Sequence, residues 1–254
     1  MKYVTKFETQ AAYTAAEGSL ILPNVSLIAE TNGVSYKPVE PAPSHDFVEI
    51  GGIKWATMNV GATGVTDYGL YFQWGDTQGY TAAQVGSGEG QKEFNSGFCD
   101  YRFLNGCIDW DAEPDYGLTK YTNADGLTTL QASDDAVTAA WGGSWRMPTT
   151  AEFQALGAAV NTAWTNDYQD TGVKGLVCTD KTDSSKVLFF PACGFAEDGG
   201  VHDVVSDGFY WSSSLYSVDV GNAWKLYFSS DGASWSNDDV RYYGFAVRGV
   251  LGEN

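Results

Sequence analysis

The spacing of apolar residues predicts strands along much of the chain beyond position 45. Residues 47–50 and 53–60 have the pattern of two strands on either side of Gly51-Gly52, a pair suited to a tight turn, and so predict a β-hairpin. Further short apolar or aromatic runs predict strands at residues 69–76, 175–178, 187–191, 209–212, 223–228 and 244–250. Residues 77–131 show weak periodicity and many Gly, Asp and Tyr residues, which predicts a long loop excursion.

Two short helices are predicted among these strands. Residues 134–141 begin with two acids, which complement the positive end of a helix dipole, and a glycine follows them. Thr149 and Glu152 can form a capping box and predict a second helix over residues 150–160. The apolar stripe of this helix consists of Phe153, Leu156, Ala159 and Val160. Strands and helices together predict an α+β fold with a mainly antiparallel sheet, two helices and long loops.

The first 44 residues differ from the rest of the chain. Residues 19–28 predict a strand, a turn and a second strand, and the proline-containing residues 39–44 predict a linker. This segment is too short to hold its own core, because an isolated two-stranded ribbon is marginal in water. We therefore expect residues 1–44 to form an attachment or oligomerisation arm and residues 45–254 to form one ligand-binding domain.

Charge and composition exclude several classes of function. The chain has 14 Lys and Arg residues against 32 Asp and Glu residues, a formal net charge of -18, whereas nucleic-acid binding needs a basic surface. No run approaches the roughly 18 apolar residues of a membrane-spanning helix, and the first residues lack the apolar stretch of an export signal. We expect a folded acidic protein with no nucleic-acid partner and no membrane insertion.

The residue types that carry common chemistry are sparse. The cysteines are Cys99, Cys107, Cys178 and Cys193. Their spacing matches neither a CxxC pair nor a zinc ribbon, and we expect free thiols, although Cys99 and Cys107 could pair across a loop. The two histidines, His45 and His202, belong to no HExxH motif, and no GxSxG or phosphate-loop motif occurs. We therefore expect no catalytic residue, metal or cofactor.

Three separated motifs resemble one family. They read WGGSWRMPT at residues 141–149, GFYWSSS at residues 208–214 and GFAVR at residues 244–248. In this order they resemble the Fibrobacter succinogenes major paralogous domain, a branch of the C-type lectin-like fold that includes variable proteins of diversity-generating retroelements. The resemblance covers roughly residues 46–251. It implies a C-type lectin-like domain that binds a ligand and catalyses no reaction.

A second, shorter resemblance concerns the start of the chain. Residues 15–26, AAEGSLILPNVS, resemble the opening of tail-associated proteins in phages of gut Bacteroidales. Together the two resemblances imply a receptor-binding or adhesin protein of a phage tail, assembled in the host cytoplasm without a signal peptide. Its arm would dock to tail components or to sister subunits of a homo-oligomer. The acidic charge slightly favours a protein over an acidic glycan as the bacterial surface receptor.

Residues 208–244 have the composition of a binding surface. They are rich in Tyr, Trp, Ser, Asp and Asn, which supply broad contacts and adaptable hydrogen bonds. In the retroelement branch, template adenines are randomised, so that Asn-type codons change to Tyr, Ser, Asp, Leu or Val among others but never to Trp or Lys. Positions that could be diversified in this way are Leu215, Tyr216, Val218, Asp219, Val220, Tyr227, Ser229, Asp231, Asp238, Asp239, Val240, Tyr242 and Tyr243. Trp211, Trp224, Lys225 and Trp235 would be scaffold or fixed contacts, with Trp235 counted among the ligand-binding residues.

Other interpretations stay open. The same polar segment could be an ordinary sheet end of a structural virion or cell-surface protein that has no specific ligand. The formylglycine-generating oxidases share the fold and use a cysteine pair with copper, a role that Cys178 and Cys193 would have to fill, although their flanks are typical of buried, inert thiols. Residues 113–115, Glu-Pro-Asp, are similar to the tripeptide of calcium-dependent lectins but precede both helices, which favours a turn.

Overall fold

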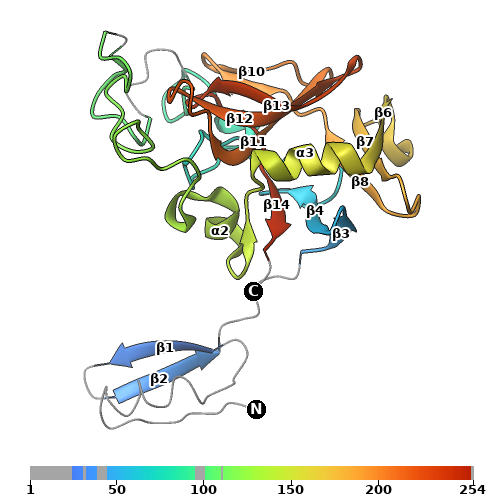
Figure 1. Cartoon of the computed structure of the whole chain (residues 1–254), viewed down its shortest axis with the longest axis horizontal. Coiled ribbons are helices and arrows are strands. Elements are labelled where there is room, and N and C mark those ends of the chain that lie inside the picture. Colours follow the sequence, from blue (N-terminus) through green and yellow to red (C-terminus); the bar gives the residue numbers. More distant parts are fainter. Residues whose placement is uncertain (1–24, 31–32, 39–44, 95–100, 110, 253–254) are drawn as a thin grey trace. The chain divides into compact units, whose positions relative to one another are not determined.

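A computed structural model describes residues 25–30, 33–38, 45–94, 101–109 and 111–252. The chain divides into two units, Met1–Ser44 and His45–Asn254 (Figure 1). In the first unit, β1 (Val25–Glu30) and β2 (Gly33–Pro38) pair antiparallel, with Val25 opposite Pro38. The described part of the strand, turn and strand predicted at residues 19–28 therefore belongs to a single strand, whose partner follows it. Residues 19–24 and the predicted linker at residues 39–44 lie outside the described residues.

The second unit contains four groups of paired strands. The first sheet has the order β3-β4-β14-β5 and joins the start of the unit to its end. Its strands are β3 (Phe47–Ile50), β4 (Ile53–Asn59), β14 (Arg248–Leu251) and β5 (Trp145–Arg146). The hairpin predicted around Gly51-Gly52 is confirmed, with Ile50 opposite Ile53.

The remaining strands follow one another along the chain. Three of them, β6 (Val160–Thr165), β7 (Gly175–Asp180) and β8 (Val187–Pro191), form a meander. A short hairpin of β9 (Phe195–Glu197) and β10 (Gly200–His202) comes next. The last sheet consists of β11 (Asp207–Leu215), β12 (Asn222–Ser229) and β13 (Gly232–Val240). Every pairing between these named strands is antiparallel.

Two α-helices occur in the described residues, α2 (Ala136–Trp141) and α3 (Thr150–Ala159), with 3-10 turns η1 (Ala82–Gln84), η2 (Ala132–Asp134) and η3 (Tyr168–Asp170). The predicted capping box of α3 is present, because Thr149 Oγ1 accepts from the amide of Glu152 and Glu152 Oε2 accepts from the amide of Thr149. None of these helices has the length and apolar character needed to cross a membrane. The fold is α+β with mainly antiparallel sheets.

The first helix starts two residues later than predicted. Asp135 is its N-cap residue, and its carboxylate accepts from the amide of Thr138 at 2.9 Å. Asp134 ends the preceding 3-10 turn η2, where its carboxylate binds Arg102 and Lys120 at 2.7 and 2.5 Å. The two acids therefore cap the helix and anchor the loop excursion instead of filling the first helical turn.

One predicted strand, at residues 69–76, is replaced by single bridges, and another, at residues 244–250, is confirmed only from residue 248 on. Within residues 69–76, Tyr71 pairs only with Tyr80 and Phe72 only with Phe245. Gly69 and Gly75 adopt φ values of 75° and 80°, which end the extended conformation at both sides. Residues 244–246 likewise form isolated bridges, so that the last strand begins at residue 248. β13 was not predicted because its sequence, GASWSNDDV, lacks a two-residue hydrophobic alternation.

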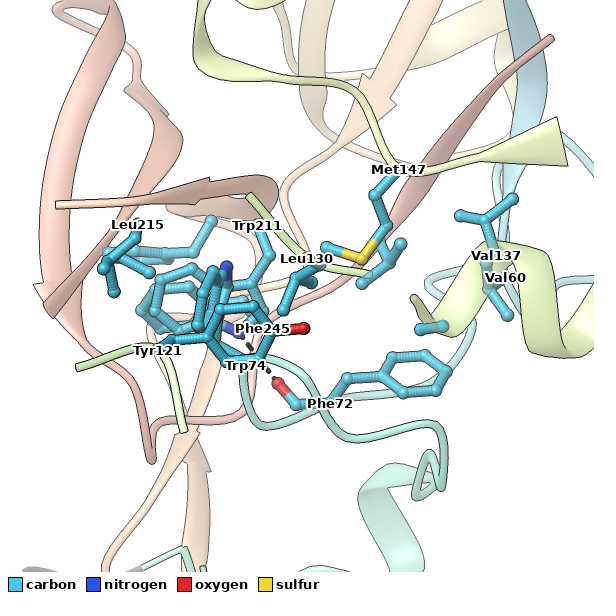
Figure 2. Close-up of a cluster of buried hydrophobic side chains, with 14 of the residues drawn as sticks. Val60, Phe72, Trp74, Tyr121, Leu130, Val137, Met147, Trp211, Leu215 and Phe245 are labelled. Atoms are coloured by element: carbon cyan, nitrogen blue, oxygen red, sulfur yellow. Dashed lines mark hydrogen bonds between the residues drawn. The ribbon is translucent and has the colours of Figure 1, made fainter. Parts of the chain in front are cut away.

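The sheet of β11, β12 and β13 lies between two apolar cores. The helix α3 crosses one face of it (Figure 1) and contributes Phe153 and Leu156 to a core with Tyr210, Leu226 and Phe228. The other core contains Trp74, Trp211 and Phe245 together with residues of the loop excursion. Figure 2 shows these rings packed together, with Trp211 Nε1 donating to the carbonyl of Phe72 at 2.9 Å.

Candidate ligand-binding surface

Three of the predicted binding residues belong to the interior. Leu215, Val220 and Tyr242 are 5%, 2% and 8% exposed and pack in the core around Trp211, where Figure 2 places Leu215. A side chain that is buried in the free protein cannot contact a partner without local unfolding. These three positions are therefore corrected to core positions, and the apolar character of Leu215 and Val220 agrees with that role.

Four further predicted residues contribute to the sheet or its packing instead of forming one common surface. Tyr216 lies edge-on to Trp224 at 4.8 Å between ring centroids, and the carboxylate of Asp238 accepts from Asn222 Nδ2 at 3.0 Å. Val240 is half-buried against the core. Trp235 packs against α3, where a Cβ on Gly157 would lie 2.6 Å from its ring. Trp235 is therefore part of the scaffold between sheet and helix.

The turns of the last sheet hold three predicted residues. Val218, 82% exposed, and Asp219 lie between β11 and β12, where Asp219 Oδ1 accepts from the amide of Gly221 at 2.9 Å. Asp231 lies between β12 and β13, next to Ser229, whose hydroxyl accepts from the Asp231 amide at 3.2 Å. The two turns are at opposite ends of β12, so these residues cannot form one compact surface.

Tyr227 and Tyr243 are brought together by a chain of aromatic contacts. Ring centroids lie 5.1 Å apart for Tyr227 and Phe209, 4.8 Å for Phe209 and Phe195, and 5.6 Å for Phe195 and Tyr243. Phe209 is buried, whereas the other three rings are partly exposed. We call Phe195, Phe209, Tyr227 and Tyr243 the aromatic strip. In the described part of the chain, this strip contains two predicted binding residues, Tyr227 and Tyr243, from separate parts of the segment 208–244.

A carboxylate fixes each tyrosine of the strip. The Tyr227 hydroxyl donates to Asp207 Oδ1 at 2.7 Å, and the Tyr243 hydroxyl donates to Glu197 Oε1. The bond to Asp207 and partial burial raise the pKa of Tyr227, while burial and the bond to Glu197 raise the pKa of Tyr243. Both phenols therefore stay protonated, and the two hydrogen bonds hold their rings in place before any ligand binds.

Lys225 lies beneath the strip with its charge enclosed. Its ammonium group pairs with Asp239 and lies 5.1 and 5.2 Å from the ring centroids of Phe209 and Phe245. Burial lowers the pKa of Lys225, and the charge of Asp239 opposes this shift. Lys225, expected as a scaffold residue or fixed contact, is only 4% exposed, and Asp239, expected as a ligand-binding residue, is engaged in this ion pair.

The hairpin of β9 and β10, which supplies Phe195, Glu197 and His202, was missed in the sequence. Its turn, Asp198-Gly199, adopts φ values of 43° and 79°, the conformation that Asp-Gly favours in two-residue hairpins. This dipeptide between two short extended runs was the signal that could have located the hairpin.

Val205 lies between β10 and β11 and is 45% exposed. Its φ is 68°, a rare conformation for a β-branched residue.

The thiols that an oxidase would need are enclosed. Cys178 and Cys193 are free and fully buried, and burial raises the pKa of Cys178 to about 12 and that of Cys193 to about 11. Protonated, enclosed thiols are poor nucleophiles and poor metal ligands. Cys107 is disulfide-bonded, so that the expectation of a free thiol is wrong at this position. Cys99 lies outside the described residues.

One further pocket and the other acidic side chains considered as binding sites are already engaged in hydrogen bonds within the protein. A pocket of about 310 Å³ beside α2 includes Asp135 and Trp145, but the Asp135 carboxylate already accepts from the amides of Thr138 and Met147. Asp115 of the Glu-Pro-Asp turn accepts from the backbone and side chain of Asn123. In the described parts of the chain, no three acidic, histidine or cysteine side chains are placed to hold a metal ion together.

Comparison with known proteins adds one match. The model of a domain of unknown function, DUF8237, matches residues 164–250, which run from β6 to β14 and include the whole aromatic strip. No curated protein and no solved structure matches the chain. The matched segment is therefore similar to a domain family of unknown function, and this match assigns no chemistry to the aromatic strip.

Proposed function

We propose that this protein is a non-enzymatic receptor-binding protein whose aromatic strip contacts a receptor on a bacterial surface. The observation that carries the proposal is the pair of partly exposed tyrosines, Tyr227 and Tyr243, held in place by hydrogen bonds to Asp207 and Glu197. Rings that are ordered before binding lose little conformational entropy when a partner covers them.

The wider biological role extends this proposal. The three motifs similar to the Fibrobacter succinogenes major paralogous domain support a C-type lectin-like domain, and the short resemblance at residues 15–26 supports a phage tail as its carrier. Residues 1–44 would then attach the domain to tail components or to sister subunits. A homo-oligomer would gain from avidity, because several weak sites could engage one cell surface at the same time.

A cell-binding experiment tests the proposal. The full chain, fluorescently labelled, is incubated with a panel of Bacteroidales isolates, and bound label is measured by flow cytometry. We expect binding to a subset of isolates that Tyr227→Ala combined with Tyr243→Ala reduces at least about tenfold, the loss of roughly 1.4 kcal/mol. Phe47→Ala is the matched control, since it removes a partly exposed ring, 46% exposed, from β3.

Two outcomes would contradict the proposal. If the tyrosine variant binds like the unchanged protein, the strip is not the contact surface. If no isolate binds the chain while the intact tail binds, the structural interpretation, in which the domain decorates the particle without a ligand, replaces the proposed one. Circular dichroism of each variant distinguishes lost contacts from lost folding.

A further inference from the structure

The aromatic strip presents ring faces and hydrogen-bond acceptors. The hydroxyl protons of Tyr227 and Tyr243 already point to Asp207 and Glu197, so each phenol oxygen and each carboxylate can only accept further bonds. His202 Nε2 lies 2.9 Å from the carbonyl oxygen of Glu197, which accepts only, so this nitrogen carries the proton.

The positive charge next to the strip is not available to a ligand. Lys225 is 4% exposed, its ammonium group pairs with Asp239, and the rings of Phe209 and Phe245 cover it. An anionic ligand would therefore meet carboxylates without a cation to oppose them, and its own acceptors would stay unsatisfied. A ligand that brings positive charge and N–H donors complements every group that the strip offers.

We propose that the aromatic strip binds an arginine or lysine side chain on the surface of a protein partner. This inference rests on the function proposed above and names the chemistry of the receptor. The cation would lie over one of the two tyrosine rings, which attract it through their electron-rich faces. The carboxylate at that end of the strip, Asp207 beside Tyr227 or Glu197 beside Tyr243, would accept its N–H groups in charge-assisted hydrogen bonds.

Two matched peptides test the chemistry of the ligand. Blocked peptides of equal length, one with arginines separated by glycines and one with citrullines at the same places, are titrated into the full chain by calorimetry. Citrulline keeps the planar N–H donors of arginine and lacks its charge. We expect the arginine peptide to bind about tenfold more tightly, with the difference shrinking as salt screens the charges. Equal affinity for the two peptides, or preference for a neutral or acidic glycan, overturns the proposal.

Two charge-matched variants test the location. Asp207→Asn with Glu197→Gln keeps acceptors for both tyrosine hydroxyls but removes two negative charges, and we expect it to lose the preference for arginine. Glu49→Gln with Glu113→Gln removes the same charge from two other exposed positions, and we expect it to keep that preference. If both variants weaken arginine binding equally, the attraction is a diffuse property of an acidic protein and the proposed site is wrong.

The two proposals fail in different ways. If cells bind through Tyr227 and Tyr243 while the peptides show no preference for arginine, the receptor is of another chemistry and only this inference is lost. If the tyrosines do not matter for cell binding, the proposed function fails, whatever the peptides show.

Discussion

Trp235 of β13 packs against Gly157 of α3 so closely that a Cβ added to the glycine would lie 2.6 Å from the indole ring. In an exposed helix, Gly→Ala is stabilising by up to about 1 kcal/mol because alanine has the higher helix propensity. At this position the methyl group has no space, and overpacking typically costs about 1–3 kcal/mol. We therefore expect Gly157→Ala to lower the free energy of unfolding, as measured by urea denaturation.

Gly64→Ala is the control for this substitution. No atom would lie within 4 Å of the added Cβ, and Gly64 has no positive φ, so we expect a neutral or slightly stabilising change. Trp235→Leu should partly relieve the cost of Gly157→Ala in the double variant, because the side chain that blocks the methyl group becomes smaller. A Gly157→Ala protein as stable as the unchanged one would show that the helix and sheet can move apart.

Arg241 is a second residue whose replacement should strongly lower the free energy of unfolding. It is 1% exposed, lies 4.8 Å from the ring centroid of Trp74, and donates to the Tyr101 hydroxyl and to carbonyls, among them that of Val220 at 2.9 Å. Arg241→Leu leaves these buried acceptors without donors, and we expect a loss of about 4 kcal/mol or more in the free energy of unfolding.

Arg146→Leu is the comparison variant, in which a partly exposed arginine is replaced, and its free energy of unfolding is measured by the same denaturation experiment. Its ion pair with Glu152 is partly exposed, with 39% of the Arg146 side chain accessible, so we expect a cost of about 1 kcal/mol or less. Comparable costs for the two arginine variants would contradict the view that Arg241 supports the interior of the loop excursion.

Asp134 makes the stability depend on acid pH. Burial alone raises its pKa, but hydrogen bonds from Lys120 and Tyr121 and the charge of Arg102 outweigh burial and hold the pKa below 3.8. Because the pKa is lower in the folded than in the unfolded chain, this stabilisation is complete above 3.8 and is lost as the pH falls through the folded value. Unfolding free energies measured between about pH 6 and pH 2 should therefore fall less steeply in Asp134→Asn. Asp111→Asn, at an exposed position of the same excursion, is the charge-matched control, and an equal change of slope in both variants would contradict the role of Asp134.

Alkylation tests the burial of the free thiols. Cys178 and Cys193 have raised pKa values of about 12 and about 11 because burial disfavours the thiolate, so we expect neither to react with iodoacetamide at pH 8 in the folded protein. Both should be labelled after denaturation, as read by mass spectrometry of the peptides that contain them. Rapid labelling of either thiol in the folded protein would revive the oxidase interpretation.

Sequence variation among clones tests diversification at individual positions. If a retroelement changes this gene, substitutions should concentrate at partly or fully exposed positions such as Val218, Tyr227 and Tyr243 and spare the buried Leu215 and Val220. The measurement is a codon-by-codon tally over residues 208–250. Equal variation at buried and exposed positions, or none beyond that of the sheet core, would sink the diversification hypothesis.

Local patterns were sufficient to predict several elements. The capping box of Thr149 and Glu152 located α3, and Gly51-Gly52 located the first hairpin of the domain, because both signals act over a few neighbouring residues. The acidic composition and the scarcity of histidine likewise follow from the sequence. The polar strand β13 was missed because pairing with β12, not its own pattern, makes it a strand.

The candidate site was decided by tertiary structure. Tyr227 and Tyr243 belong to a Tyr-rich segment that composition marks as a binding surface, but composition cannot tell which of its residues face inward. Only the folded chain brings Phe195 and Glu197, from a hairpin far away in sequence, against Tyr243. Only the fold buries Leu215, Val220 and Tyr242. The side on which Leu215 lies depends on the register and the bulge of β11, and Val220 and Tyr242 lie in connections outside the strands, where no period marks the buried side.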